Sequence, residues 1–145
     1  MKKIMSCAKL FFYIILLVAL LIPLCKLSYK MILDNKSVVN ESYIETTIIE
    51  MFNTYQENEI VANDTYKNKV CQFVMNLENI NDDSSGHPFT YVNVDDCEVV
   101  ITFGKNQRNI LRNKKTGDSI KVRARCKGFE KLFHDIEFNQ AIVIE

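Results

Sequence analysis

The chain has little of the chemistry on which enzymes depend. Among its 145 residues it has no tryptophan, two histidines, two prolines and four glycines. His87 and His134 have no cysteine or carboxylate at the spacing of a metal site. The sequence also has no glycine-rich phosphate loop and no nucleophile elbow. It therefore predicts a protein that is not an enzyme, with no catalytic residue, metal or cofactor.

The charges balance overall but are unevenly distributed. Eighteen Lys and Arg residues match eighteen Asp and Glu residues. Residues 1–30 carry five lysines and no acid, residues 31–104 carry thirteen acids against three lysines, and residues 105–127 carry nine cations against Asp118 alone. A hydrophobic content of 48% excludes a disordered chain, and the length allows one modest domain.

The one long apolar run lies near the N-terminus. Leu10–Cys25 contains sixteen residues without a charge and is bounded by lysines on both sides. As a helix it would span about 24 Å of a core of about 30 Å, which is enough if the lysines reach the two interfaces. No small-x-small cleavage site follows, and Leu24 precedes the cysteine where a lipoprotein has a small residue. Residues 1–30 are therefore predicted to be an uncleaved signal anchor, with a cleaved or lipidated signal as the alternative.

The flanking charges suggest an orientation for this anchor. Three lysines precede the run and two follow it, which favours a cytoplasmic N-terminus. We expect a single-pass protein of the cell membrane, attached through residues 10–25, with its C-terminal domain outside the cytoplasm. A secreted protein or a lipoprotein is the alternative. Residues 31–42 are predicted to be a linker, and residues 43–145 the domain.

The remaining periodicity predicts one helix followed by five strands. Ser42 and Glu45 have the spacing of a capping box and predict a helix over residues 43–58. Residues 104–117 are expected to form a short helix or loop. Alternation of apolar and polar residues predicts strands over residues 69–77, 89–94, 97–103, 119–127 and 136–144. This is the element order of a mainly β chain, a helix leading into a five-stranded OB-fold barrel.

Residues in three segments also match a family pattern. They are Tyr55, Asn58, Glu59, Ala62, Tyr66, Lys67, Lys69 and Val70; Gly86, Pro88 and Tyr91; and Gly117, Asp118, Val122, Cys126, Lys127 and Gly128. This pattern resembles the tRNA_anti-like family of OB-fold domains over about residues 45–144. The resemblance implies a small secreted or membrane-attached bacterial protein. Met75 and Ala124 stand where the family usually has glycine, and Ile101 and Ala141 where it often has cysteine.

The basic segment is the candidate ligand site. Oligonucleotides bind OB folds along cationic grooves lined with aromatic side chains. The alternatives are a solvated face or contact with anionic lipid, protein or a glycan. Because outward charges contribute little to folding, serine at 121, 123 and 125 is expected to leave stability unchanged. The candidate residues are Arg112, Lys114 and Lys115, followed by an outward row on the fourth strand, Lys121, Arg123, Arg125 and Lys127.

Three cysteines are predicted to point inward from their strands. Cys71 lies near the start of the first strand and Cys126 near the end of the fourth. Antiparallel pairing would bring these ends together, within reach of a disulfide. A Cys71–Cys126 disulfide and a set of buried thiols are the two alternatives, and Cys97 is expected to be free in both.

Together these features predict a membrane-anchored, extracytoplasmic OB-fold module that binds a ligand or assists another protein without catalysis. The alternative is a nucleic-acid-binding OB-fold protein that uses the basic fourth strand. Salt dependence would distinguish these functions, because binding to phosphates weakens steeply as salt rises.

Overall fold

The structure, a computed structural model, describes residues 21–22, 38–130 and 135–144. Of the predicted anchor, only Leu21 and Ile22 fall within these ranges, and both are helical and exposed. The rest of the anchor lies outside the described residues. The described part of the chain contains no helix long and apolar enough to span a membrane. The anchor and the predicted division into anchor, linker and domain therefore remain predictions.

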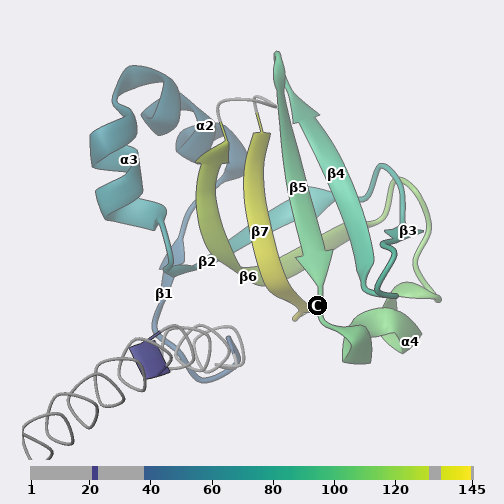
Figure 1. Ribbon diagram of the computed structural model, residues 1–145. Coiled ribbons are helices and arrows are strands. Elements are labelled where there is room, and N and C mark those ends of the chain that lie inside the picture. Colours follow the sequence, from purple (N-terminus) through teal and green to yellow (C-terminus); the bar gives the residue numbers. More distant parts are fainter. Residues whose placement is uncertain (1–20, 23–37, 131–134, 145) are drawn as a thin grey trace, which may run out of the picture. The chain divides into compact units, whose positions relative to one another are not determined.

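Seven strands form one mixed sheet with the order β1-β2-β6-β7-β5-β4-β3 (Figure 1). The pairs β1–β2 and β5–β7 are parallel, and the other pairs are antiparallel. The central order β2-β6-β7-β5-β4 is the one expected for the five strands of an OB fold. The strands are β1 (Tyr43–Glu45), β2 (Val70–Asn76), β3 (Asn81–Asp82), β4 (Pro88–Val94), β5 (Cys97–Phe103), β6 (Ser119–Glu130) and β7 (Asp135–Val143).

The five predicted strands are confirmed, but the predicted five-stranded barrel is not. The sheet has two more strands than expected and is not closed. β1 pairs with β2 at residues 70–72, and β3 pairs with β4 at residues 88–89. These short strands therefore pair with edges of β2 and β4, the two strands that would have to pair with each other in a closed barrel.

The helical region differs from the prediction. Residues 43–45 form β1, and the helix α2 (Ile48–Glu57) begins after Thr47, whose Oγ1 accepts a hydrogen bond from the Glu50 N–H at 3.0 Å. Thr47 and Glu50 have the same spacing as Ser42 and Glu45, so the predicted cap was placed five residues too early. A second helix, α3 (Glu59–Tyr66), follows directly and was not predicted separately.

The core lies between α2 and the inner faces of the strands. The alternation predicted for β6 holds, whereas β2 buries Val70–Phe73 in succession, including Gln72, and alternates only after them. Phe73 lies opposite Val122, and both side chains are buried. The Phe73 and Phe138 rings pack with their centres 5.0 Å apart. The other large buried members include Met51, Phe52, Tyr55, Met75, Leu77, Ile101, Phe103, Leu111, Ile120 and Ile136. Because the inner side of β6 is fully used by this core, its alternate residues must face outward.

The position of the helix cap is testable. Thr47→Ala should lower the free energy of unfolding by about 1 kcal/mol, because it removes the acceptor for the Glu50 N–H. Ser42→Ala, the matched change at the predicted cap, should change it by less than about 0.3 kcal/mol. Urea unfolding followed by circular dichroism measures both values. A larger loss for Ser42→Ala would place the cap at the earlier residue.

Candidate anion-binding site

The outward row of β6 forms as predicted, but it is not an open groove. Its four cations are half-buried and alternate with the buried Ile120, Val122, Ala124 and Cys126. The segment Val38–Glu45, called the 38–45 segment below, supplies partners to three of the four cations. Residues 38–42 of this segment belong to the predicted linker. Part of the charge expected for a ligand is therefore used within the chain.

Arg123 is held by three groups. Its Nε and Nη2 donate to Gln72 Oε1 at 3.2 and 2.8 Å, and its Nη1 donates to the Val39 carbonyl at 2.9 Å. The centre of the guanidinium lies 4.1 Å from the centre of the Tyr43 ring, a cation–π distance. The planar guanidinium thus joins β2, β6 and the 38–45 segment.

Arg125 and Lys121 meet the acidic residues of the same segment. Arg125 Nη2 lies 2.8 Å from Glu41 Oε1, its Nη1 donates to the Asn68 carbonyl at 3.1 Å, and its Nε donates to Gln140 Oε1 at 3.2 Å. The Arg125 side chain is only 12% exposed. Lys121 Nζ lies 3.7 Å from Glu45 Oε1. These contacts join the 38–45 segment to the sheet, which changes the expectation that serine at these positions would leave stability unaffected.

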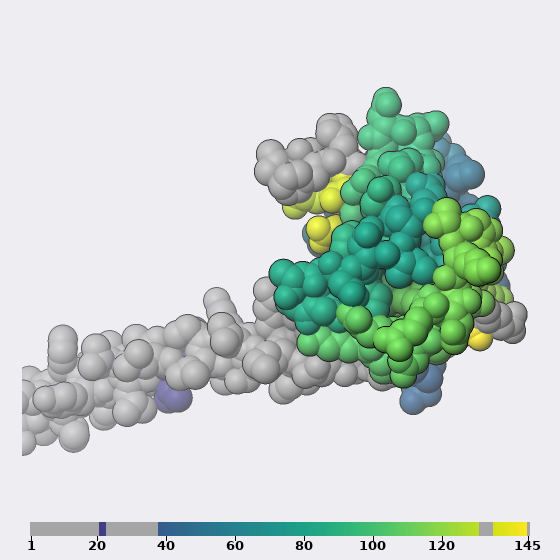
Figure 2. All heavy atoms as spheres, turned by 90° about the vertical axis from the view of Figure 1, so that its right-hand side faces the viewer, coloured from purple at the N-terminus to yellow at the C-terminus, as the bar shows by residue number. Residues whose placement is uncertain are grey.

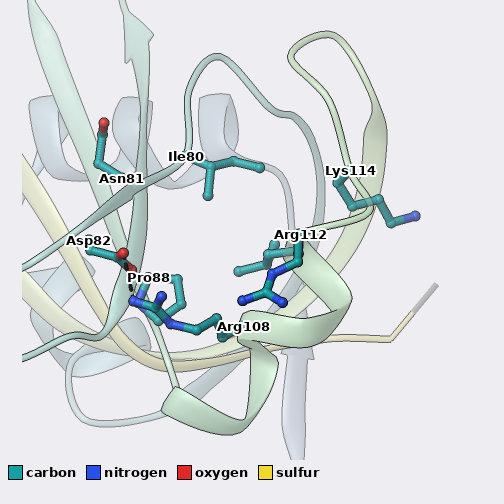
Figure 3. Close-up of a pocket in the computed structure, with 8 residues that line it drawn as sticks. Ile80, Asn81, Asp82, Pro88, Arg108, Arg112 and Lys114 are labelled. Atoms are coloured by element: carbon teal, nitrogen blue, oxygen red, sulfur yellow. Dashed lines mark ion pairs between the residues drawn. The ribbon is translucent and has the colours of Figure 1, made fainter.

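A pocket of about 320 Å³ lies between the β3–β4 hairpin and the helix α4 (Arg108–Leu111), which follows the 3-10 turn η1 (Lys105–Gln107). The two segments lie side by side on one face of the domain, with residues around 80 in teal and those around 115 in green (Figure 2). The pocket brings two of the predicted residues, Arg112 and Lys114, together with six that were not predicted. Its lining is Ile80, Asn81, Asp82, Pro88, Arg108, Leu111, Arg112 and Lys114 (Figure 3).

Two of the three cations in the pocket are not neutralised. Arg108 Nη2 lies 2.6 Å from Asp82 Oδ2. Arg112 points its guanidinium toward the same space, whereas Lys114 points its ammonium outward at the rim (Figure 3). Within the described ranges, the side chains of Arg112 and Lys114 have no ion-pair or hydrogen-bond partner. One carboxylate among three cations leaves two positive charges beside an apolar wall of Ile80, Pro88 and Leu111.

The remaining predicted cations do not join this pocket. Lys115 is exposed, and its backbone N–H donates to Asp118 Oδ2 at 2.8 Å in the turn before β6. Lys127 lies half-buried at the far end of the row on β6. Asp82 was not among the residues predicted from the sequence, because it meets Arg108 of α4 only through the fold.

Of the two alternatives for the described cysteines, the structure has the set of buried free thiols and not the Cys71–Cys126 disulfide. Cys71 lies opposite Ala124, and the Cys126 N–H donates to the Lys69 carbonyl, which places the two cysteines two residues out of register. Tyr55 Oη lies 3.8 Å from Cys126 Sγ. Burial, together with the neighbouring Cys126, raises the pKa of the Cys71 thiol to about 12. No set of three His, Cys, Asp or Glu side chains in the described residues could hold a metal ion.

No family model and no curated protein matches the chain. Among solved structures, it is similar to a lipoprotein of Klebsiella pneumoniae that is named for nucleic-acid binding. The two share 12% identity with a TM-score of 0.55, over 74% of this chain and 95% of that one. At this identity the similarity shows a shared fold. Yeast Stn1 and Ten1 (11% identity, TM-score 0.44, 78% of this chain and 69% of that one) and the asparaginyl-tRNA synthetase of Entamoeba histolytica (13%, 0.40, 71% and 23%) are more distant matches.

The contacts that Arg125 and Lys121 make with the 38–45 segment give a prediction about stability. Arg125→Ser should lower the free energy of unfolding by about 2–3 kcal/mol, because it leaves the half-buried Glu41 carboxylate and the Asn68 carbonyl without their charged donor. Lys121→Ser, with its longer contact to the exposed Glu45, should cost less than about 0.5 kcal/mol. If urea unfolding gave equally small losses of unfolding free energy for both variants, the contacts of Arg125 with this segment would not stabilise the domain.

The raised pKa of Cys71 gives a pH prediction. The folded state holds this thiol protonated up to about pH 12, whereas an unfolded thiol ionises near pH 9. The contribution of the thiol to stability is therefore complete below pH 9 and is lost as the pH rises from about 9 to 12. Plots of the free energy of unfolding against pH for the wild type and for Cys71→Ala should converge over this interval. Curves that stay parallel from pH 8 to 11 would mean that Cys71 is not protected from ionisation.

Proposed function

We propose that this protein is a non-enzymatic binding module of the OB-fold type that takes an anionic ligand in the pocket beside α4. The observation that carries the proposal is the contrast between two groups of cations. Arg123 and Arg125 are bound by other groups of the chain, whereas Arg112 and Lys114 lie at a pocket and have no side-chain partner among the residues that the structure describes.

The arrangement has an energetic consequence. Arg108 and Arg112 lie four residues apart at one turn of helix, where like charges repel by about 0.2–0.5 kcal/mol. Asp82 forms its ion pair with Arg108 and not with Arg112. An anion that enters the pocket would offset the remaining repulsion. Positive potential in a concave, partly apolar site also concentrates anions near it.

We further propose that the domain is attached to the membrane and faces away from the cytoplasm. Support comes from the uncharged run Leu10–Cys25 with its flanking lysines. The similar Klebsiella pneumoniae protein is named as a lipoprotein, which agrees with an envelope location. An attached module with a cationic pocket would hold its ligand or partner at the membrane surface.

Single-stranded nucleic acid is a second candidate for the ligand, and β4 gives a specific reason. Thr90 is fully buried, so its neighbours Phe89 and Tyr91 face outward from β4, and both are half-buried. Phe89 lies opposite Asn81, a residue of the pocket, in the pairing of β3 with β4. Outward aromatic side chains next to cations are what OB folds use to stack bases and bind the backbone. The similar lipoprotein is also named for nucleic-acid binding.

A paired comparison tests the position of the site. The probe is a labelled single-stranded oligo-dT, and its binding to the full chain in neutral detergent is followed by fluorescence anisotropy. The double variant Arg112→Ser/Lys114→Ser should bind at least about tenfold more weakly. Its slope of log K against log salt should be smaller by about 1.4, since each lost phosphate contact accounts for about 0.7 with single strands.

The matched control is Lys121→Ser/Lys127→Ser, which removes the same charge from the row on β6. We expect less than about a threefold change, because the α4 pocket keeps its cations. A larger loss in this control than in the α4 pair would contradict the proposed site. Absence of oligonucleotide binding to the wild type would remove the nucleic-acid candidate and leave a smaller anion as the ligand.

A further inference from the structure

The ion pair at the pocket wall already places a carboxylate where a ligand anion would bind. Asp82, from β3, reaches Arg108 of α4 across the opening (Figure 3). Both side chains are close to half exposed, at 49% and 44%. Exposed ion pairs of this kind contribute about 0–1 kcal/mol. A stronger anion could therefore displace Asp82 at little energetic cost.

Arginine gives such an anion a strong site. A guanidinium binds phosphate or carboxylate through two parallel charge-assisted hydrogen bonds, which are about twice as strong as neutral ones. Arg112 has no competing partner among the described residues. Arg108 would become a second donor once Asp82 is displaced. Lys114, on a flexible stem at the rim, can add a third charge.

We propose that the pocket selects a phosphate monoester, whose phosphate contacts Arg112 and takes the place of Asp82 on Arg108. This inference rests on the proposed anion-binding function and names its ligand class. A monoester carries nearly two negative charges at neutral pH, because its second pKa is about 6. Those charges match the two unbalanced positive charges of the pocket. A phosphodiester carries one charge and has two free oxygens rather than three, so it matches less well.

The apolar part of the pocket limits what is attached to the phosphate. Ile80, Pro88 and Leu111 form a wall without charge. A volume of about 320 Å³ is at the lower end of the range of about 300–1,000 Å³ for small-ligand sites. The pocket therefore fits a phosphate with one small apolar or aromatic body. A terminal nucleotide and the headgroup of phosphatidic acid share this chemistry.

Thymidine 5′-monophosphate, its methyl phosphodiester and unmodified thymidine are matched probes for the phosphate. Titration calorimetry on the full chain in neutral detergent should give binding of the monoester at least about tenfold tighter than that of the other two. Arg112→Gln should weaken monoester binding about tenfold. Asp82→Asn should strengthen it about threefold or more, because Arg108 is then free. Asp96→Asn, with the same charge change in the β4–β5 turn, should alter it by less than twofold.

The outcomes separate this inference from the function on which it rests. If monoester and diester bind equally and both are lost in Arg112→Gln, the pocket binds anions but the monoester proposal is wrong. If Asp82→Asn weakens binding, Asp82 is not a competitor and the proposal is also wrong. If neither phosphate binds, both the inference and the anion pocket are wrong. Competition by phosphatidic acid in mixed detergent micelles, but not by phosphatidylglycerol, would assign the monoester to a lipid headgroup, and no competition by either would leave the nucleotide.

Discussion

The antiparallel ladder between β2 and β6 is the constraint on which the other features of this domain depend. Its register places Phe73 opposite Val122 and directs both into the core. The alternate residues of β6, which include the four cations of the row from Lys121 to Lys127, must then lie outside. Their repulsion is relieved by the 38–45 segment, which brings Glu41 to Arg125 and the Tyr43 ring to Arg123. The 38–45 segment, which includes the short parallel strand β1, therefore neutralises part of the charge that the core packing forces outward.

This arrangement assigns different roles to two groups of basic residues. The cations of β6 are half-buried and, where their contacts are defined, are bound to oxygens or to an aromatic ring of the chain. Removing them should cost stability more than binding. The cations near α4 lie at a pocket whose described lining contains one carboxylate, that of Asp82. Removing Arg112 or Lys114 should cost binding and little stability, because neither side chain holds another part of the domain in place.

The sequence predicted the strands well because their pattern is local. Strict alternation over residues 119–127 reflects one buried face, and the buried positions within this range were predicted correctly. The helix cap was misplaced because Ser42 and Thr47 begin the same short motif, and only pairing of β1 with β2, far along the chain, chooses between them. The pocket itself was not predicted, and two of its eight lining residues were among the candidates. Arg112 and Lys114 were visible as charge, but Ile80 and Asp82 join them through a contact between hairpin and helix that has no local signature.

The most direct test of this division of roles is to map binding residue by residue. Backbone amide shifts of the labelled full chain, followed by NMR during titration with single-stranded oligo-dT or thymidine 5′-monophosphate, report where the anion lies. We predict that the largest changes fall at residues 80–88 and 108–114, with residues 121–127 almost unchanged. The largest changes along residues 121–127, with the α4 region unaffected, would contradict the account, because they would show that the row on β6 is the ligand site.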